Sequence, residues 1–98
     1  MKNYEIMCIL MPNLEQSELD KEIHALSKIL TDNGANLTGT NTEAWGMRDL
    51  AYEIKKQTKG YYVVFTLSAD SKAIDAFNRA TKLDQKVLRS LVTVAPKQ

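Results

Sequence analysis

The sequence predicts an α+β fold in which one four-stranded antiparallel sheet carries both helices on a single face. Two segments, residues 14–34 and 68–83, repeat apolar side chains at helical spacing. Four further segments are rich in apolar and β-branched residues and give the element order β-α-β-β-α-β. This order is the signature of the split βαβ, ferredoxin-like sandwich, and 98 residues suit one such domain over residues 1–98.

The first strand and the first helix are predicted over residues 3–34. The stretch "NYEIMCILM", residues 3–11, is apolar and is followed closely by a "PN" break, as a first strand would be. Acidic residues gather early in residues 14–34, where they favour the helix dipole, and Asn33-Gly34 supplies a left-handed residue that ends a helix. One apolar stripe of this helix is expected to face the core: Leu19, Ile23, Leu26 and Leu30.

The middle of the chain predicts a hairpin. Residues 35–54 are rich in threonine and weakly apolar, which indicates a long edge strand with a bulge or bend at Gly46. The stretch "KKQTKG", residues 55–60, is typical of a polar turn, in which Gly60 fits a hairpin, and a third strand follows in "KGYYVVFTL", residues 59–67. Three side chains of the edge strand are expected to pack on the core: Leu50, Tyr52 and Ile54. Trp45 either packs on the end of the sheet, which we favour, or contacts a protein partner.

The second helix and the last strand complete the predicted set. Ser68, Asp70 or Ser71 can cap the helix of residues 68–83. The last strand is "VLRSLVTVA", residues 87–95. The apolar side of the second helix consists of four residues: Ala73, Ile74, Phe77 and Ala80.

Alternation along the strands predicts which side chains face the helices and which face outward. The inward set consists of Tyr4, Ile6, Cys8 and Leu10 in the first strand, Tyr61, Val63, Phe65 and Leu67 in the third, and Leu88, Ser90, Val92 and Val94 in the last. The outward set includes an apolar group that we expect to form a protein-partner surface: Met7, Ile9, Met11, Tyr62, Val64 and Leu91. Clustered apolar residues on an uncovered sheet usually mark an interface.

The aromatic third strand raises the possibility of RNA base stacking. A glycine followed by aromatic residues is typical of the strand that stacks bases in an RNA-recognition motif. That motif needs open aromatic rings at the positions of Tyr61 and Val63, but the second position has no ring and both are expected in the core. Tyr61 and Tyr62 are therefore predicted to serve packing and protein contact.

Composition argues against catalysis and against a membrane protein. The formal net charge is only +1, no long apolar run is present, and the N-terminus has no signal-peptide pattern, which together indicate a soluble cytoplasmic protein. Cys8 is expected to be buried and His24 to be solvated on a helix, so they form neither a metal set nor a nucleophile–base pair. We expect no catalytic site, no metal, no other cofactor and no small-molecule substrate.

Basic residues cluster along the predicted edge of the sheet. Lys82 and Lys86 lie around the entry to the last strand, close in sequence to Arg89. Such a group can neutralise RNA phosphates, although ordinary surface solubility explains each residue alone nearly as well. Six residues are predicted to contact RNA: Lys2, Arg48, Lys55, Lys56, Lys59 and Arg89.

The segment "WGMRDLAYEIKK", residues 45–56, resembles the bacterial small-subunit ribosomal protein six family. The likeness covers nearly the whole chain and includes, in order, "YE" at 4–5, "PNL" at 12–14, "NGA" at 33–35, "KGYY" at 59–62 and "VLRSLV" at 87–92. The chain departs from the family in its last strand, where Leu88 replaces the first of two adjacent arginines that the family often has.

The resemblance implies a non-catalytic structural constituent of the small ribosomal subunit, located in the cytoplasm. It implies binding to the central domain of small-subunit ribosomal RNA, cooperatively with ribosomal protein eighteen of that subunit as a heterodimer. Two alternatives from other classes stay open on the residues alone. One is a small ferredoxin-like enzyme such as a phosphatase, and the other is a free-standing single-strand RNA binder.

Overall fold

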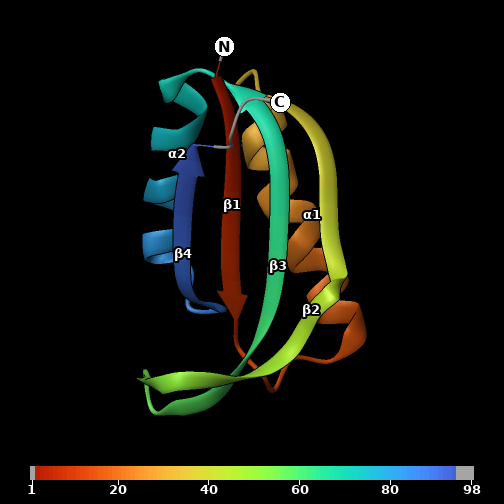
Figure 1. Ribbon diagram of the computed structural model, residues 1–98, viewed down its shortest axis with the longest axis vertical. Helices are drawn as coiled ribbons and strands as arrows, with labels where there is room; N and C mark the ends of the chain where they lie inside the picture. Colours follow the sequence, from red (N-terminus) through yellow and green to blue (C-terminus); the bar gives the residue numbers. More distant parts are fainter. Residues whose placement is uncertain (1, 95–98) are drawn as a thin grey trace.

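The computed structural model describes residues 2–94, except for the side chains of residues 41–45. The elements are β1 (Lys2–Leu10), α1 (Gln16–Asp32), β2 (Asn36–Ile54), β3 (Gln57–Ala69), α2 (Ser71–Leu83) and β4 (Val87–Val94). The four strands form one antiparallel sheet in the order β2-β3-β1-β4, and both helices cover the same face (Figure 1). The predicted ferredoxin-like fold is confirmed.

The core lies between the helices and the inner face of the sheet. Ile6, Cys8 and Leu10 of β1 are fully buried there, and Tyr61 is half-buried at its margin. Phe65 of β3 and Phe77 of α2 meet edge to face, with ring centroids 6.4 Å apart and an interplanar angle of 74°. The strand phase predicted for β1 and β3 is therefore correct, because these residues alternate as a sheet with one covered face requires.

The ends of the helices follow the sequence closely. Gly34 has a φ of +90° just after α1, which is the left-handed conformation that glycine adopts most readily. The backbone N–H of Ala35 returns to the carbonyl oxygen of Leu30 at 3.0 Å and closes the last turn. Asp70 occupies the N-cap position of α2, as one of the three predicted candidates.

A register shift at the start of β4 corrects the predicted inward set of that strand. Leu10 pairs with Val87, whereas Ile9 pairs with Arg89, so one extra residue is accommodated between them. Val87 consequently enters the core, while Leu88 is buried outside the core cluster. Val94 was predicted inward but is exposed near the end of the strand.

The far part of the β2–β3 hairpin, residues 47–60, extends beyond the sheet and is called the hairpin arm here. Gly46 has a φ of +57° at an irregularity in the β2–β3 register, which confirms the predicted bend. From there the arm swings across the end of the sheet toward β4 (Figure 1). Lys55 and Lys56 form its turn with φ values of 49° and 66°, and Gly60 lies inside β3 rather than in the turn as predicted.

The direction of the arm explains why its side chains miss the core. Leu50 and Ile54 are half-buried and lie outside the core cluster, and Tyr52 is 57% exposed. The prediction of these three residues as core was wrong, because the arm leaves the face that the helices cover. The predicted packing of Trp45 concerns a side chain outside the described residues.

Candidate RNA and protein interface

The outer face of the sheet carries apolar side chains in rows that cross three strands. In one row Val64 of β3 pairs with Met7 of β1, which pairs with Leu91 of β4. In the next row Tyr62 pairs with Ile9, which pairs with Arg89. Five of the six predicted partner residues thus lie together on the uncovered face, while Met11 lies just beyond the end of β1.

The accessible part of this face differs from the prediction. Ile9 and Val64 were expected to be open, but they are only 8% and 6% exposed. The Ile9 side chain fills the space above Gly60, where a Cβ atom would meet Ile9 Cγ2 and lie 3.3 Å from Leu50 Cδ2. The glycine therefore lets the arm close over Ile9. Leu91 remains 57% exposed.

Two contacts hold the hairpin arm against the opposite edge of the sheet. The Arg89 guanidinium donates a hydrogen bond to the Tyr52 hydroxyl, and Arg89 Cζ lies 5.5 Å from the centroid of the Tyr52 ring. Lys55 Nζ donates to the carbonyl oxygen of Val87 at 3.3 Å. The arm therefore brings cationic side chains of the hairpin to the start of β4.

The six predicted RNA-contacting residues fall in separate places. Lys2 lies where β1 begins, and it borders a shallow depression with Tyr4 and Asp70. The others lie toward the opposite end of the sheet or along the arm. Arg48 and Lys59 border one depression of the arm, Lys55 and Arg89 border a cavity beside β4, and Lys56 is exposed in the turn.

The basic groups therefore form two pairs and two single residues, Lys56 in the turn and the distant Lys2. The Lys59 ammonium lies 4.0 Å from Asp49 Oδ1, so an ion pair partly compensates the arm set of Arg48 and Lys59. Lys55 and Arg89 instead donate hydrogen bonds to neutral oxygen atoms. A single RNA surface that includes Lys2 as well would have to span the length of β1, so the structure favours the arm and the start of β4.

The described residues contain no group of three or more His, Cys, Asp and Glu side chains suited to holding a metal ion. Cys8 is buried as predicted, and burial together with the nearby Glu22 charge raises the pKa of its thiol to about 12. A thiol with that pKa is a poor nucleophile at neutral pH. His24 is exposed on α1, as predicted. None of the helices in the described part is long and apolar enough to span a membrane.

Glu22 is a charged residue of α1 that lies on the buried side of the helix. Its side chain is buried, and its Oε2 atom has no hydrogen-bond partner among the described residues. Burial, and then a hydrogen bond and the charge of Asp84, raise the pKa of Glu22 to about 7, although Lys86 opposes this. The i, i+3 and i+4 spacing of Glu22 from the buried Leu19 and Leu26 is the signal that places it on the inner stripe.

Comparison with known proteins gives the same family as the motif in residues 45–56. The family profile described as "Ribosomal protein S6" matches residues 3–93. The chain is 43% identical over 93 residues to proteins named "Small ribosomal subunit protein bS6" from Shouchella clausii and from Halalkalibacterium halodurans. Each alignment covers 95% of this chain and 96% of the relative.

The fold also matches a solved structure. The crystal structure of 30S ribosomal protein S6 from Thermotoga maritima superposes with a TM-score of 0.88 at 24% sequence identity. That match covers 96% of this chain and 87% of the Thermotoga maritima chain and supports the shared fold. From its family profile and its bS6 relatives, the chain belongs to the ribosomal protein S6 family, whose members are structural proteins of the ribosome and not enzymes.

Proposed function

We propose that this structural protein of the small ribosomal subunit binds the central domain of small-subunit ribosomal RNA as a heterodimer with ribosomal protein eighteen of that subunit. The ribosome places it in the cytoplasm. Family membership removes the phosphatase alternative. The observation that carries the proposal is the uncovered apolar face of the sheet beside a cationic edge, because it offers adjoining surfaces for a protein and for RNA.

The protein surface of the proposal is the outer face of β1, β3 and β4. Met7 lies in its centre between Val64 and Leu91. Both helices cover the opposite face, so they leave this row available (Figure 1). Ile9 is already covered within the chain, so the proposed contact rests mainly on Met7, Tyr62 and Leu91. Methionine and tyrosine suit such a surface because they present adaptable or amphipathic apolar area.

The RNA surface of the proposal is the basic arm and the start of β4. A net charge of +1 gives the molecule no broad positive field. Local groups must therefore supply the phosphate contacts, and Lys55, Lys56 and Arg89 stand close enough along the chain and the fold to act together. The partner protein, docked on the neighbouring face, adds to the RNA contact, so partner and RNA binding are expected to be coupled.

The test is a titration of a central-domain RNA fragment with the protein, in the presence and absence of purified ribosomal protein eighteen. The proposal predicts weak, salt-sensitive binding by the protein alone. Added partner should raise the affinity by roughly 5- to 150-fold, the usual range for coupled sites. Tight and sequence-specific binding without the partner would favour the free-standing RNA binder instead. An affinity that the partner leaves unchanged would contradict the heterodimer.

A further inference from the structure

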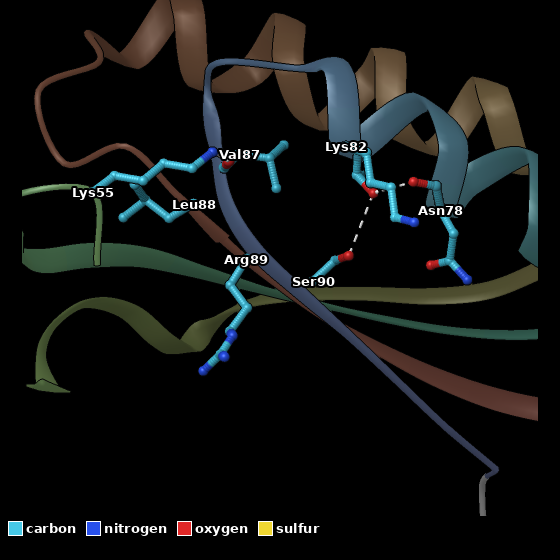
Figure 2. Close-up of a pocket in the computed structure, with 8 residues that line it drawn as sticks. Lys55, Asn78, Lys82, Val87, Leu88, Arg89 and Ser90 are labelled. Atoms are coloured by element: carbon cyan, nitrogen blue, oxygen red, sulfur yellow. Dashed lines mark hydrogen bonds between the residues drawn. The ribbon is translucent and has the colours of Figure 1, made fainter. Parts of the chain in front are cut away.

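A cavity of about 450 Å³ lies between α2 and β4 at an edge of the sheet (Figure 2). β4 pairs with β1 on one side only, so its other edge is free in the sheet order β2-β3-β1-β4. Three cationic residues from three elements border the cavity: Lys55 of the arm turn, Lys82 of the last turn of α2, and Arg89 of β4. The described residues that line it include no carboxylate, so its chemistry suits an anion.

The cations of this cavity keep their charges available. Lys55 Nζ donates to a backbone carbonyl oxygen, and Arg89 meets the neutral Tyr52 hydroxyl. Lys82 is exposed, and no carboxylate of the described residues forms an ion pair with any of the three. Neutral partners fix the positions of Lys55 and Arg89 without cancelling their charge. The Arg89 side chain points to the other side of β4 (Figure 2), so the charges at the opening itself are those of Lys55 and Lys82.

Neutral polar groups line the wall on the helix side. The Thr81 hydroxyl donates to the carbonyl oxygen of Asn78 at 3.2 Å, and its oxygen lies 3.4 Å from Ser90 Oγ. Thr81 has a single hydroxyl proton, so the Ser90 hydroxyl must be the donor between them. The lone pairs of Ser90 Oγ then remain as acceptors at the cavity. Figure 2 shows Ser90 pointing toward α2 and Arg89 pointing away to the other side of β4.

The row of cationic residues beside the cavity continues from Lys82 along α2 for one more turn. A neighbouring cavity shares Asn78 and Lys82 with the first and adds Arg79. Asp75 also borders this second cavity, so an anionic chain would gain less beyond Arg79. The row therefore has the form of a short groove along the edge of β4, longer than a single phosphate requires.

We propose that this groove binds the sugar–phosphate backbone of an RNA strand along the free edge of β4. Lys82 and Lys55 contact phosphates, and Ser90 accepts a hydrogen bond from a ribose 2′-hydroxyl, which is how a protein distinguishes RNA from DNA. The inference rests on the proposed function and extends it, because it moves part of the RNA surface from the hairpin onto α2. A peptide strand added to the β4 edge would not need the charges of Lys55 and Lys82.

The first test is the salt dependence of binding to a central-domain RNA fragment in the presence of ribosomal protein eighteen. Lys82→Gln should lower the slope of log affinity against log salt by about 0.7–0.9, the value for one phosphate contact. Lys28→Gln on α1 removes the same charge from an exposed site and should leave the slope unchanged. Equal slopes for Lys82→Gln and wild type would overturn the groove, while partner-dependent binding by both would leave the proposed function standing.

A second measurement locates the RNA directly. A hydroxyl-radical probe tethered through Ser90→Cys should cleave the bound RNA backbone, whereas the same probe at Thr31→Cys on α1 should cleave weakly. Cys8 is buried with a raised thiol pKa, so the probe labels the introduced site selectively at neutral pH. Cleavage from position 31 but not from position 90 would overturn the proposal. Cleavage of ribosomal protein eighteen in place of RNA by the probe at position 90 would also overturn it.

Discussion

The Arg89 guanidinium of β4 donates a hydrogen bond to the hydroxyl of Tyr52 and lies 5.5 Å from the centroid of its ring. β2 and β4 are the two edges of the sheet, so this contact joins residues that the sheet itself keeps apart. Together with the Lys55–Val87 hydrogen bond, it fixes the hairpin arm at the start of β4. Arg89 therefore both holds the hairpin arm in place and belongs to the candidate RNA surface.

The Tyr52–Arg89 contact predicts that removal of the Tyr52 ring lowers stability only slightly. It should have a larger effect on how well the hairpin arm is held in place. Tyr52→Ala should lower the free energy of unfolding by about 0.5–1 kcal/mol, the usual value of an exposed cation–π pair. Tyr52→Phe keeps the ring and should retain most of that stability. Urea denaturation measures both, and amide hydrogen exchange in residues 47–60 should quicken more in the alanine variant. Equal exchange in all three proteins would show that Tyr52 does not hold the arm.

The close approach at Gly60 predicts overpacking on substitution. A Cβ at Gly60 would meet Ile9 Cγ2, so Gly60→Ala should destabilise the protein by about 1–3 kcal/mol. In an Ile9→Ala background the obstructing Cγ2 atom is absent, so Gly60→Ala should cost less there than in the wild-type protein. A double-mutant cycle, measured by denaturant unfolding, compares the two single variants with the double variant. Simple additivity of the two substitutions would mean that Ile9 is not the obstructing side chain.

The buried Glu22 predicts that stability falls with rising pH. Its pKa is about 7 in the folded state and near 4.5 when exposed, so the folded protein holds the proton more tightly. The stabilisation from protonated Glu22 is complete below about pH 4.5 and is lost as the pH rises through about 7. Each pKa unit corresponds to about 1.4 kcal/mol.

Urea midpoints between pH 4 and pH 8 test this dependence. Glu22→Gln stays neutral throughout, so it should flatten the profile and be more stable than wild type at pH 8. Glu18→Gln, at an exposed position of the same helix, should keep the wild-type profile. Parallel profiles for Glu22→Gln and wild type would show that another group causes the dependence.

The two adjacent tyrosines of β3 should respond differently to truncation. Tyr61 packs at the margin of the core and Tyr62 lies on the outer face, although both are half-buried. Tyr61→Ala should cost about 2–4 kcal/mol, at or below the lower part of the range for fully buried aromatic residues. Tyr62→Ala should cost less in the isolated protein and weaken partner binding. Denaturant melts and partner titrations of both variants measure the difference.

The sequence predicts the sheet and helices well because local rules determine them. Strand alternation in β1 and β3 identifies Ile6, Cys8, Val63 and Phe65 as inward, and Gly34 marks the end of α1. These features depend on neighbours in the chain, so periodicity and turn chemistry are sufficient.

The hairpin arm and the site were predicted less well because they depend on contacts between distant elements. Tyr52 alternates with apolar neighbours as a core residue would, yet its partner Arg89 is 37 positions away. No pattern within β2 shows that the arm turns from the helix-covered face. The burial of Ile9 has the same cause, since Gly60 and Leu50 approach it from the arm. Lys82 joins Lys55 and Arg89 only once α2 packs beside β4.

Isothermal titration with ribosomal protein eighteen is the most direct test of the partner surface that we propose on the outer face of the sheet. Leu91 is exposed in the apolar row, and Leu83 is an exposed leucine at the end of α2, away from that row. Leu91→Gln should weaken binding about tenfold, as loss of an apolar interface contact does, with little change in stability. Leu83→Gln should bind as wild type does. Unchanged affinity for Leu91→Gln, together with weaker binding by Leu83→Gln, would contradict the proposed partner surface. The partner would then bind on the helical side.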